Sequence, residues 1–121
     1  MKLGHIGIPV GDLEASKQFY DAIVPFLKLE RVDRGEEGNV RYGEDGSTRL
    51  YIHTRAEGLT NLHLCLDVAS REDVDAFFAA GLAAGGTDHG APGIRPDYSP
   101  TYYAAFLLDP DGNNIEAVCR D

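Results

Sequence analysis

The chain has 121 residues, of which 43% are hydrophobic and 26% charged, and its formal net charge is −9. This size and composition predict one soluble globular domain whose core needs no disulfides. The acidic balance argues against nucleic acid as a partner, because phosphate binding needs a basic surface. No apolar run is long enough to span a membrane, and strand-like sequence begins within two residues of the start. We therefore expect a cytoplasmic protein without a signal peptide.

The first half of the chain predicts a strand, a helix and three further strands. Residues 3–9 alternate as a short strand that places His5 on the face opposite Ile6 and Ile8. Asp12 then stands at the N-cap position of a helix with apolar residues at helical spacing, namely Phe19, Tyr20, Ile23, Val24 and Leu27. Three segments between turn residues read as strands, at about 28–33, 39–44 and 48–53.

The second half repeats this order. A shift of 58 positions lays His5 on His63 and Phe19 on Phe77. A second helix follows a capping box formed by Ser70 and Asp73. The repeat predicts an α+β protein of one domain, residues 1–121, built from two βαβββ modules at about 1–55 and 60–121.

The Asp-Gly turns of the two halves match at an offset of 66, since Asp45 lies on Asp111. The second copy therefore holds eight extra residues, which we place in an enlarged loop over residues 89–101. At the same offset Leu50 is the counterpart of Glu116. The two cysteines, Cys65 and Cys119, lie in predicted strands without metal-binding spacing, so we expect reduced thiols in the core.

Residues 102–118, YYAAFLLDPDGNNIEAV, predict a β-hairpin whose last strand carries Glu116 between Ile115 and Ala117. The apolar neighbours of His5 and His63 should pack under the helices, so both imidazoles and Glu116 should face away from them. Two histidines and a carboxylate suit a divalent metal with open coordination positions. The alternative is that the histidines are ordinary hydrogen-bonded groups and that Glu116 pairs with an arginine such as Arg49.

Two stretches, LGHIGIPVGDLEASKQFYDAI and LDPDGNNIEAV, together with the duplicated order, resemble the vicinal oxygen chelate superfamily of glyoxalases, bleomycin-resistance proteins and extradiol dioxygenases. In that family two βαβββ modules form an eight-stranded open cup around a metal, with helices on the outside. The resemblance implies that His5, His63 and Glu116 hold a divalent ion such as Zn, Mn, Fe, Ni or Mg. It also implies a homodimer, although the modules could pair within one chain or be exchanged between two.

The sequence departs from particular members of that family. Leu50 replaces the fourth ligand of the glyoxalase I type, and strand parity places His53 on the wrong face, with Cys119. Phe106 stands where the fosfomycin-modifying transferases usually carry a tyrosine. The dioxygenases use a further histidine near the metal, and the chain offers no clear equivalent unless His89 folds back.

Polar residues of the enlarged loop and the following strand complete the predicted site. With Glu116 we expect Tyr102 to be catalytic, as a phenol that acts as donor or acid. Arg95, Tyr98 and Tyr103 could clamp an anionic substrate, or else cap the sheet or line a dimer interface.

The first functional hypothesis is a metal-dependent lyase, isomerase or dioxygenase that binds a small substrate through two adjacent oxygens. The second is a metal-free protein of the bleomycin-resistance type that sequesters a cationic ligand, which the acidic composition suits. A third is a scaffold or regulatory subunit that kept the residues without the chemistry.

Overall fold

The structure, a computed structural model, describes residues 4–33, 35, 37–54 and 62–121. Its elements in chain order are β1 Ile6–Val10, α1 Leu13–Ile23, the 3-10 helix η1 Val24–Leu27, β2 Glu30–Arg31, β3 Asn39–Glu44, β4 Ser47–Thr54, β5 His63–Asp67, α2 Arg71–Ala83, β6 Thr87–Ile94, β7 Tyr103–Leu108 and β8 Asn114–Cys119. Each half is thus a βαβββ module, and the predicted α+β duplication is confirmed. The predicted module limits near residues 55 and 60 lie at or within a segment outside the described residues.

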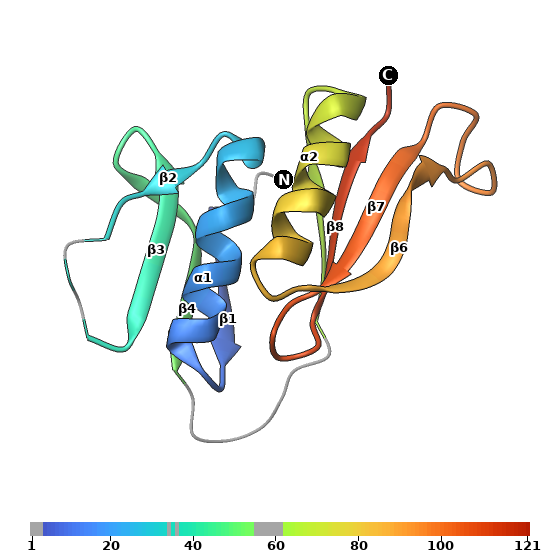
Figure 1. Ribbon diagram of the computed structural model, residues 1–121. Coiled ribbons are helices and arrows are strands. Elements are labelled where there is room, and N and C mark those ends of the chain that lie inside the picture. Colours follow the sequence, from blue (N-terminus) through green and yellow to red (C-terminus); the bar gives the residue numbers. More distant parts are fainter. Residues whose placement is uncertain (1–3, 34, 36, 55–61) are drawn as a thin grey trace.

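The strands form two four-stranded sheets of the same topology, with the orders β1-β4-β3-β2 and β5-β8-β7-β6. In each sheet the first strand of the module runs parallel to the last one, and the remaining pairs are antiparallel. Figure 1 shows the two sheets as separate units on either side of the helices. The eight strands therefore do not join into one sheet within the described part of the chain.

Both helices begin where side-chain caps satisfy free backbone amides. The Asp12 carboxylate accepts a hydrogen bond from the amide of Ala15, and the Ser70 hydroxyl accepts one from the amide of Asp73. The apolar faces of the helices supply Phe19 and Phe77, both fully buried, to a core shared by the two modules. Local sequence thus fixes the helix starts, and apolar burial fixes the face that each helix turns inward.

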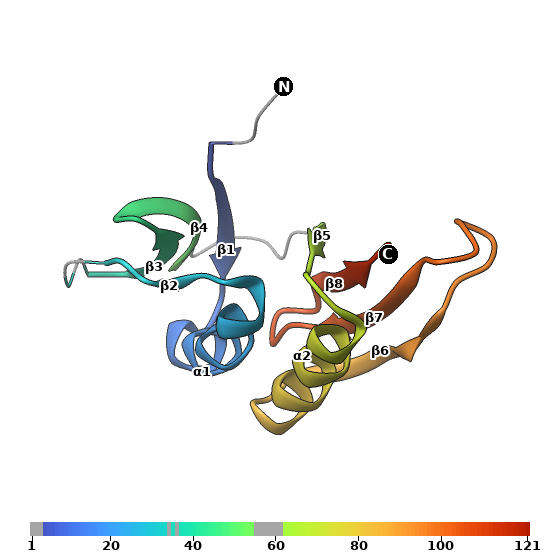
Figure 2. The ribbon, with the colours of Figure 1, turned by 90° about the horizontal axis from the view of Figure 1, so that it is seen from above.

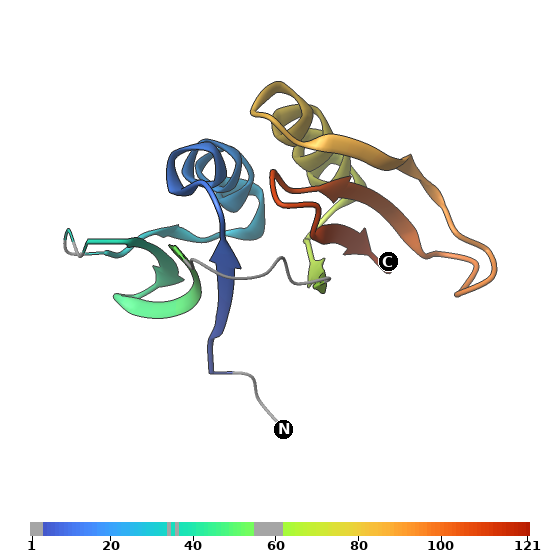
Figure 3. The same cartoon turned by 90° about the horizontal axis from the view of Figure 1, so that it is seen from below.

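The two helices lie against each other in the middle of the molecule, and each covers one face of its own sheet. Views from above and below show that the other faces of the two sheets point away from one another (Figures 2 and 3). We call the face that no helix covers the free face of each sheet. Two free faces that point apart cannot enclose a common ligand within one chain.

The DPDG turn between β7 and β8 ties the second module to the first. The Tyr20 hydroxyl of α1 donates a 2.7 Å hydrogen bond to Asp109, and the amide of Gly11 donates a 2.9 Å hydrogen bond to Asp111. The contact of Tyr20 with Asp109 is buried. These aspartates therefore do more than form a turn, because they fix where one module sits on the other.

One predicted boundary differs from the structure. The segment expected to be a loop over residues 89–101 contributes its first half to β6, which continues to Ile94 and pairs with β7. Register shifts on both sides of Gly90 interrupt this pairing. Glycine and proline weaken the strand signal of this segment, whereas its hydrogen bonds to β7 hold it in the sheet. No helix in the described ranges is long and apolar enough to cross a bilayer.

Candidate functional site

The free face of the second sheet carries a buried carboxylate beside a histidine. Glu116 on β8 is only 3% exposed, and its Oε1 atom lies 2.9 Å from Nε2 of His63 on β5. The Tyr102 hydroxyl donates a short hydrogen bond to the other oxygen, Oε2. Ile115 and Ala117 point into the core, so the alternation of β8 turns Glu116 to the free face as predicted.

Glu116 has no arginine partner among the described residues. Arg49, the partner that the alternative reading suggested, belongs to the first sheet and contacts Glu44 at 3.4 Å. A buried carboxylate is costly unless hydrogen bonds or a positive charge offset its lost hydration. Here His63 and Tyr102 provide the hydrogen bonds.

Groups beside Glu116 are held in their protonated forms. Burial, followed by the hydrogen bond to Glu116, raises the pKa of Tyr102 above its ordinary value. Partial burial and the charge of Glu116 raise the pKa of the Cys65 thiol to about 11. Cys65 is exposed on the free face rather than in the core, whereas Cys119 is buried as predicted. At neutral pH the carboxylate thus faces a phenol and a thiol that both keep their protons.

His5 does not join this cluster within one chain. It precedes β1 in the other sheet, is exposed, and lies with its ring centroid 5.8 Å from that of Tyr51. No group of three or more metal-binding side chains gathers in the part of the chain that the structure describes. A single chain therefore brings together two of the three predicted ligands, His63 and Glu116.

The counterpart of Glu116 in the first module is Tyr51, and the prediction of Leu50 is wrong. Tyr51 pairs with Gly7 as Glu116 pairs with Cys65, and Gly7 and Cys65 are equivalent first-strand positions. Leu50 instead packs in the core at 2% exposure. The cause is a β-bulge, because β4 advances by two residues, from Thr48 to Leu50, while β3 advances by one. The position still lacks a carboxylate.

The same one-residue shift places the His53 side chain on the face opposite to the predicted one. Its ring lies 5.4 Å from that of Tyr51, on the free face of the first sheet, whereas Cys119 lies in the core. His53 pairs with Pro9, at the far end of β1 from His5. Along a strand this separation corresponds to about 13 Å. His53 therefore cannot bind the same ion as His5.

The predicted substrate-binding residues separate into two groups. The exposed Tyr98 ring lies 5.0 Å from that of Tyr102, and the Arg95 guanidinium lies 5.4 Å from the centroid of Phe106. Tyr103 takes the opposite face, where its hydroxyl donates a 2.6 Å hydrogen bond to Asp75 of α2. Alternation along β7 explains the difference, so Tyr103 is not part of the site.

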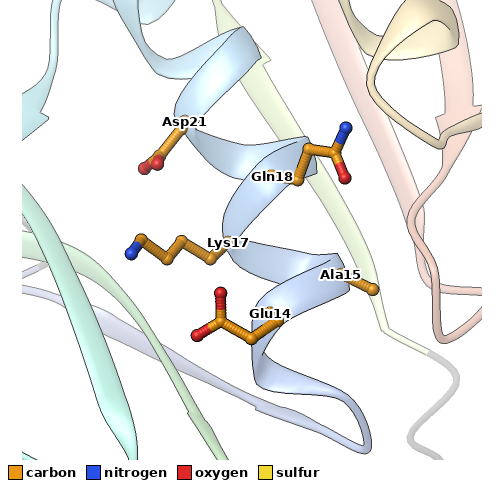
Figure 4. Close-up of a pocket in the computed structure, with 5 residues that line it drawn as sticks. All are labelled: Glu14, Ala15, Lys17, Gln18 and Asp21. Atoms are coloured by element: carbon orange, nitrogen blue, oxygen red, sulfur yellow. The ribbon is translucent and has the colours of Figure 1, made fainter.

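A cavity of about 420 Å³ adjoins His63 on the second module. It is lined by Leu62, His63, His89, Leu108, Gly112 and Asn114. His89 therefore lines the same cavity as His63, which is the placement that the sequence allowed only if His89 folded back. Another hollow, of about 330 Å³, lies along α1 with Glu14, Lys17 and Asp21 at its edge (Figure 4). It carries mixed charges on a helix surface and has no connection to the histidines.

The sequence model of a protein family, the Glyoxalase/Bleomycin resistance protein/Dioxygenase superfamily, matches residues 2–117 of the chain. The chain belongs to this superfamily. A glyoxalase/bleomycin resistance protein from Albidiferax ferrireducens is 36% identical, with a TM-score of 0.78 over 98% of both chains. None of the curated proteins matches the chain.

Other solved members of the superfamily share the fold at lower identity. A glyoxalase-related enzyme from Fulvimarina pelagi is 22% identical, with a TM-score of 0.74 over 98% of this chain and 88% of that one. A lactoylglutathione lyase from Agrobacterium tumefaciens is 18% identical, with a TM-score of 0.69 over 98% and 92%. This agreement extends over both modules.

The donor set of this superfamily member fits a divalent cation. His63 offers an imidazole nitrogen and Glu116 a carboxylate oxygen, and the two atoms already lie 2.9 Å apart on the free face. Nitrogen and oxygen donors of this kind suit first-row divalent ions. His5 supplies a third donor of matching type only from the other sheet.

Proposed function

We propose that this protein is a metal-dependent enzyme whose site combines His63 and Glu116 of one copy with His5 of a second copy. The observation that carries the proposal is the buried carboxylate of Glu116, 2.9 Å from His63 on an uncovered sheet face. A buried carboxylate without a cationic partner is costly, and a bound cation would offset that cost.

The second copy is required because the free faces of one chain point apart. In a symmetric homodimer, the first module of one copy could face the second module of the other. Each of the two resulting cups would then hold one His5 opposite one pair of His63 and Glu116. This arrangement keeps the predicted ligand set and assigns it to two chains.

The bound metal would act as a Lewis acid toward a small substrate that has oxygens on neighbouring atoms. The chain itself supplies the remaining functions. Glu116 is oriented by the hydroxyl of Tyr102, which donates its proton in a hydrogen bond to Oε2 of Glu116. Tyr51 leaves the first module without a carboxylate base. The chemistry that fits is therefore that of a lyase, isomerase or dioxygenase in which Tyr102 donates or relays the proton.

Metal titration tests this proposal. Chelator-treated protein should bind one Co²⁺ or Mn²⁺ per chain, as measured by calorimetry and elemental analysis. His63→Ala should weaken this binding by more than the roughly hundredfold that loss of an outer-shell partner costs. His53→Ala, a histidine on a free face but distant from His5, is the matched control and should bind normally. Wild-type protein that binds no metal, or equal binding by His63→Ala, would contradict the proposal.

The second candidate function is metal-free sequestration of a cationic ligand. The observation in its favour is the net charge of −9 on a protein with two uncovered sheet faces. It predicts that a cationic ligand binds equally well with and without chelator and that His63→Ala has no effect. The metal titration therefore separates the two functions.

A further inference from the structure

A row of four residues crosses the free face of the second sheet at the height of Glu116. Cys65, Glu116, Phe106 and Gly90 are register partners on β5, β8, β7 and β6. The Phe106 ring thus lies between the carboxylate on one side and a glycine on the other. The Arg95 side chain occupies the space above that glycine.

Backbone groups hold the guanidinium of Arg95 in one place. Its Nη1 and Nη2 atoms donate hydrogen bonds of 2.8 and 2.7 Å to the carbonyl oxygens of Gly93 and Ala91. A Cβ atom at Gly90 would lie 3.3 Å from Nη2, and one at Gly93 would lie 3.2 Å from Nη1. The two glycines therefore leave the room that the guanidinium fills, and the Phe106 ring supports it from below.

The charge of Arg95 has no acidic partner among the described residues. Arg41 and Arg71 also lack an acidic partner among the described residues, so what distinguishes Arg95 is that backbone groups anchor its guanidinium on the free face. Carbonyl oxygens occupy two of its donors but do not neutralise it. A positioned and uncompensated guanidinium on an open sheet face is suited to a carboxylate, which it can bind through parallel hydrogen bonds.

The distance between the Arg95 guanidinium and Glu116 limits the length of a ligand that can contact both groups. Two strand intervals separate Glu116 from Gly90, which corresponds to about 10 Å. The Phe106 ring occupies the interval, with its centroid 6.2 Å from that of His63. We infer that the substrate is an organic acid whose carboxylate binds Arg95 while an apolar segment on Phe106 carries its neighbouring oxygens to His63 and Glu116. This inference rests on the proposed function and adds the substrate class to it.

A matched pair of ligands tests whether the carboxylate of the substrate contributes to binding. We would titrate the protein by calorimetry, in the presence of Mn²⁺ and without oxygen, with 3,4-dihydroxyphenylpropanoate and with 3,4-dihydroxyphenylpropanamide, which differ essentially in charge. The wild type should bind the acid about tenfold more tightly than the amide, as expected for one charge-assisted contact. Equal binding of the two ligands, or no binding of either at millimolar concentration, would overturn the inference.

Variants test whether Arg95 is the residue that causes the preference for the acid over the amide. Arg95→Met should bind both ligands equally, and Arg95→Lys should retain part of the preference because it keeps the charge. Arg71→Met is the control, because Arg71 also stacks on an aromatic ring, at 5.1 Å from the centroid of Tyr103, but on the helix side. A preference that survives in Arg95→Met, or that Arg95→Lys loses as fully as Arg95→Met, would contradict the assignment.

The same preparations separate this inference from the proposed function. Metal binding by wild-type protein without any acid preference would overturn the substrate class alone. An acid preference that depends on Arg95, in a protein that binds no metal, would overturn the metal-dependent function alone.

Discussion

Asn114 lies two positions before Glu116 on β8 and lines the cavity next to His63. Its side-chain Oδ1 atom is buried and has no hydrogen-bond partner among the described residues. Such an atom has lost its contact with water without replacing it, which costs about 1–3 kcal/mol of folding free energy. A polar residue kept at that cost next to the candidate ligands is consistent with a role in the site rather than in stability.

We predict that Asn114→Val makes the protein more stable by about 1 kcal/mol. Valine removes the orphaned oxygen and suits a strand position, while the backbone hydrogen bond to Leu62 is unaffected. Urea unfolding followed by far-ultraviolet circular dichroism measures the change in unfolding free energy. A variant less stable than wild type would contradict the prediction, because it would show that the side-chain amide of Asn114 makes stabilising contacts.

At the scale of elements, hydrogen bonds to Asp109 hold the DPDG turn between β7 and β8 together. Asp109 is 3% exposed and accepts hydrogen bonds from the Tyr20 hydroxyl, the amides of Asp111 and Asn113, and the Asn113 side chain. Its carboxylate thus shapes the turn and anchors α1 of the other module at the same time. Sequence reasoning recognised the turn but not this anchoring, because the partner lies 89 residues away.

Asp109→Ala should lower the unfolding free energy by at least about 3 kcal/mol. The substitution leaves several buried donors without an acceptor, which costs more than the loss of any single hydrogen bond. Thermal and urea unfolding measure the change. Asp88→Ala is the control, because Asp88 accepts one exposed hydrogen bond, from Gly90, and its loss should cost under about 1 kcal/mol. Equal losses in the two variants would contradict the anchoring role.

The contact between Tyr20 and Asp109 also predicts a pH dependence. Burial, followed by the charge and hydrogen bond of Asp109, raises the pKa of Tyr20 well above its ordinary value of 10.0. Above pH 10 the unfolded chain loses this proton while the folded protein keeps it. The unfolding free energy should therefore fall as the pH rises above 10.

Tyr20→Phe should be less stable than wild type at neutral pH by about 1–2 kcal/mol, and its stability should fall less steeply above pH 10. Urea unfolding at a series of alkaline pH values measures both effects. Tyr98→Phe, at a tyrosine that is 68% exposed, is the control and should follow the wild type. A slope for Tyr20→Phe as steep as that of the wild type would assign the alkaline loss to other groups.

At the scale of the whole molecule, the duplication made the fold predictable. Capping residues and apolar periodicity fixed the helices at Asp12 and Ser70, and parity fixed the face of Glu116. The one-residue error at Leu50 arose because a bulge adds a residue to β4 that no residue type announces. The positions of His89 and Arg95 relative to the sheet could not be predicted, because a glycine-rich segment does not indicate where a strand begins, bends or ends.

The placement of the two modules relative to each other could not be predicted from the sequence, for a different reason. Parity says which side chains share a face of one sheet, but not which way two sheets face each other. That choice depends on the fit between α1 and α2 and on the aspartates of the β7–β8 turn. It decides whether His5 meets His63 within one chain or only across two.

Mixing two inactive variants tests whether the site is shared between copies. His5→Ala and His63→Ala should each bind little metal alone. In a mixed dimer, the His63 of the first variant faces the intact His5 of the second, and one complete site forms while the other lacks both histidines. Random pairing makes half of the dimers mixed, so co-refolded protein should recover about a quarter of the wild-type Co²⁺ capacity. A site contained within one chain would recover none, because neither chain holds all three ligands.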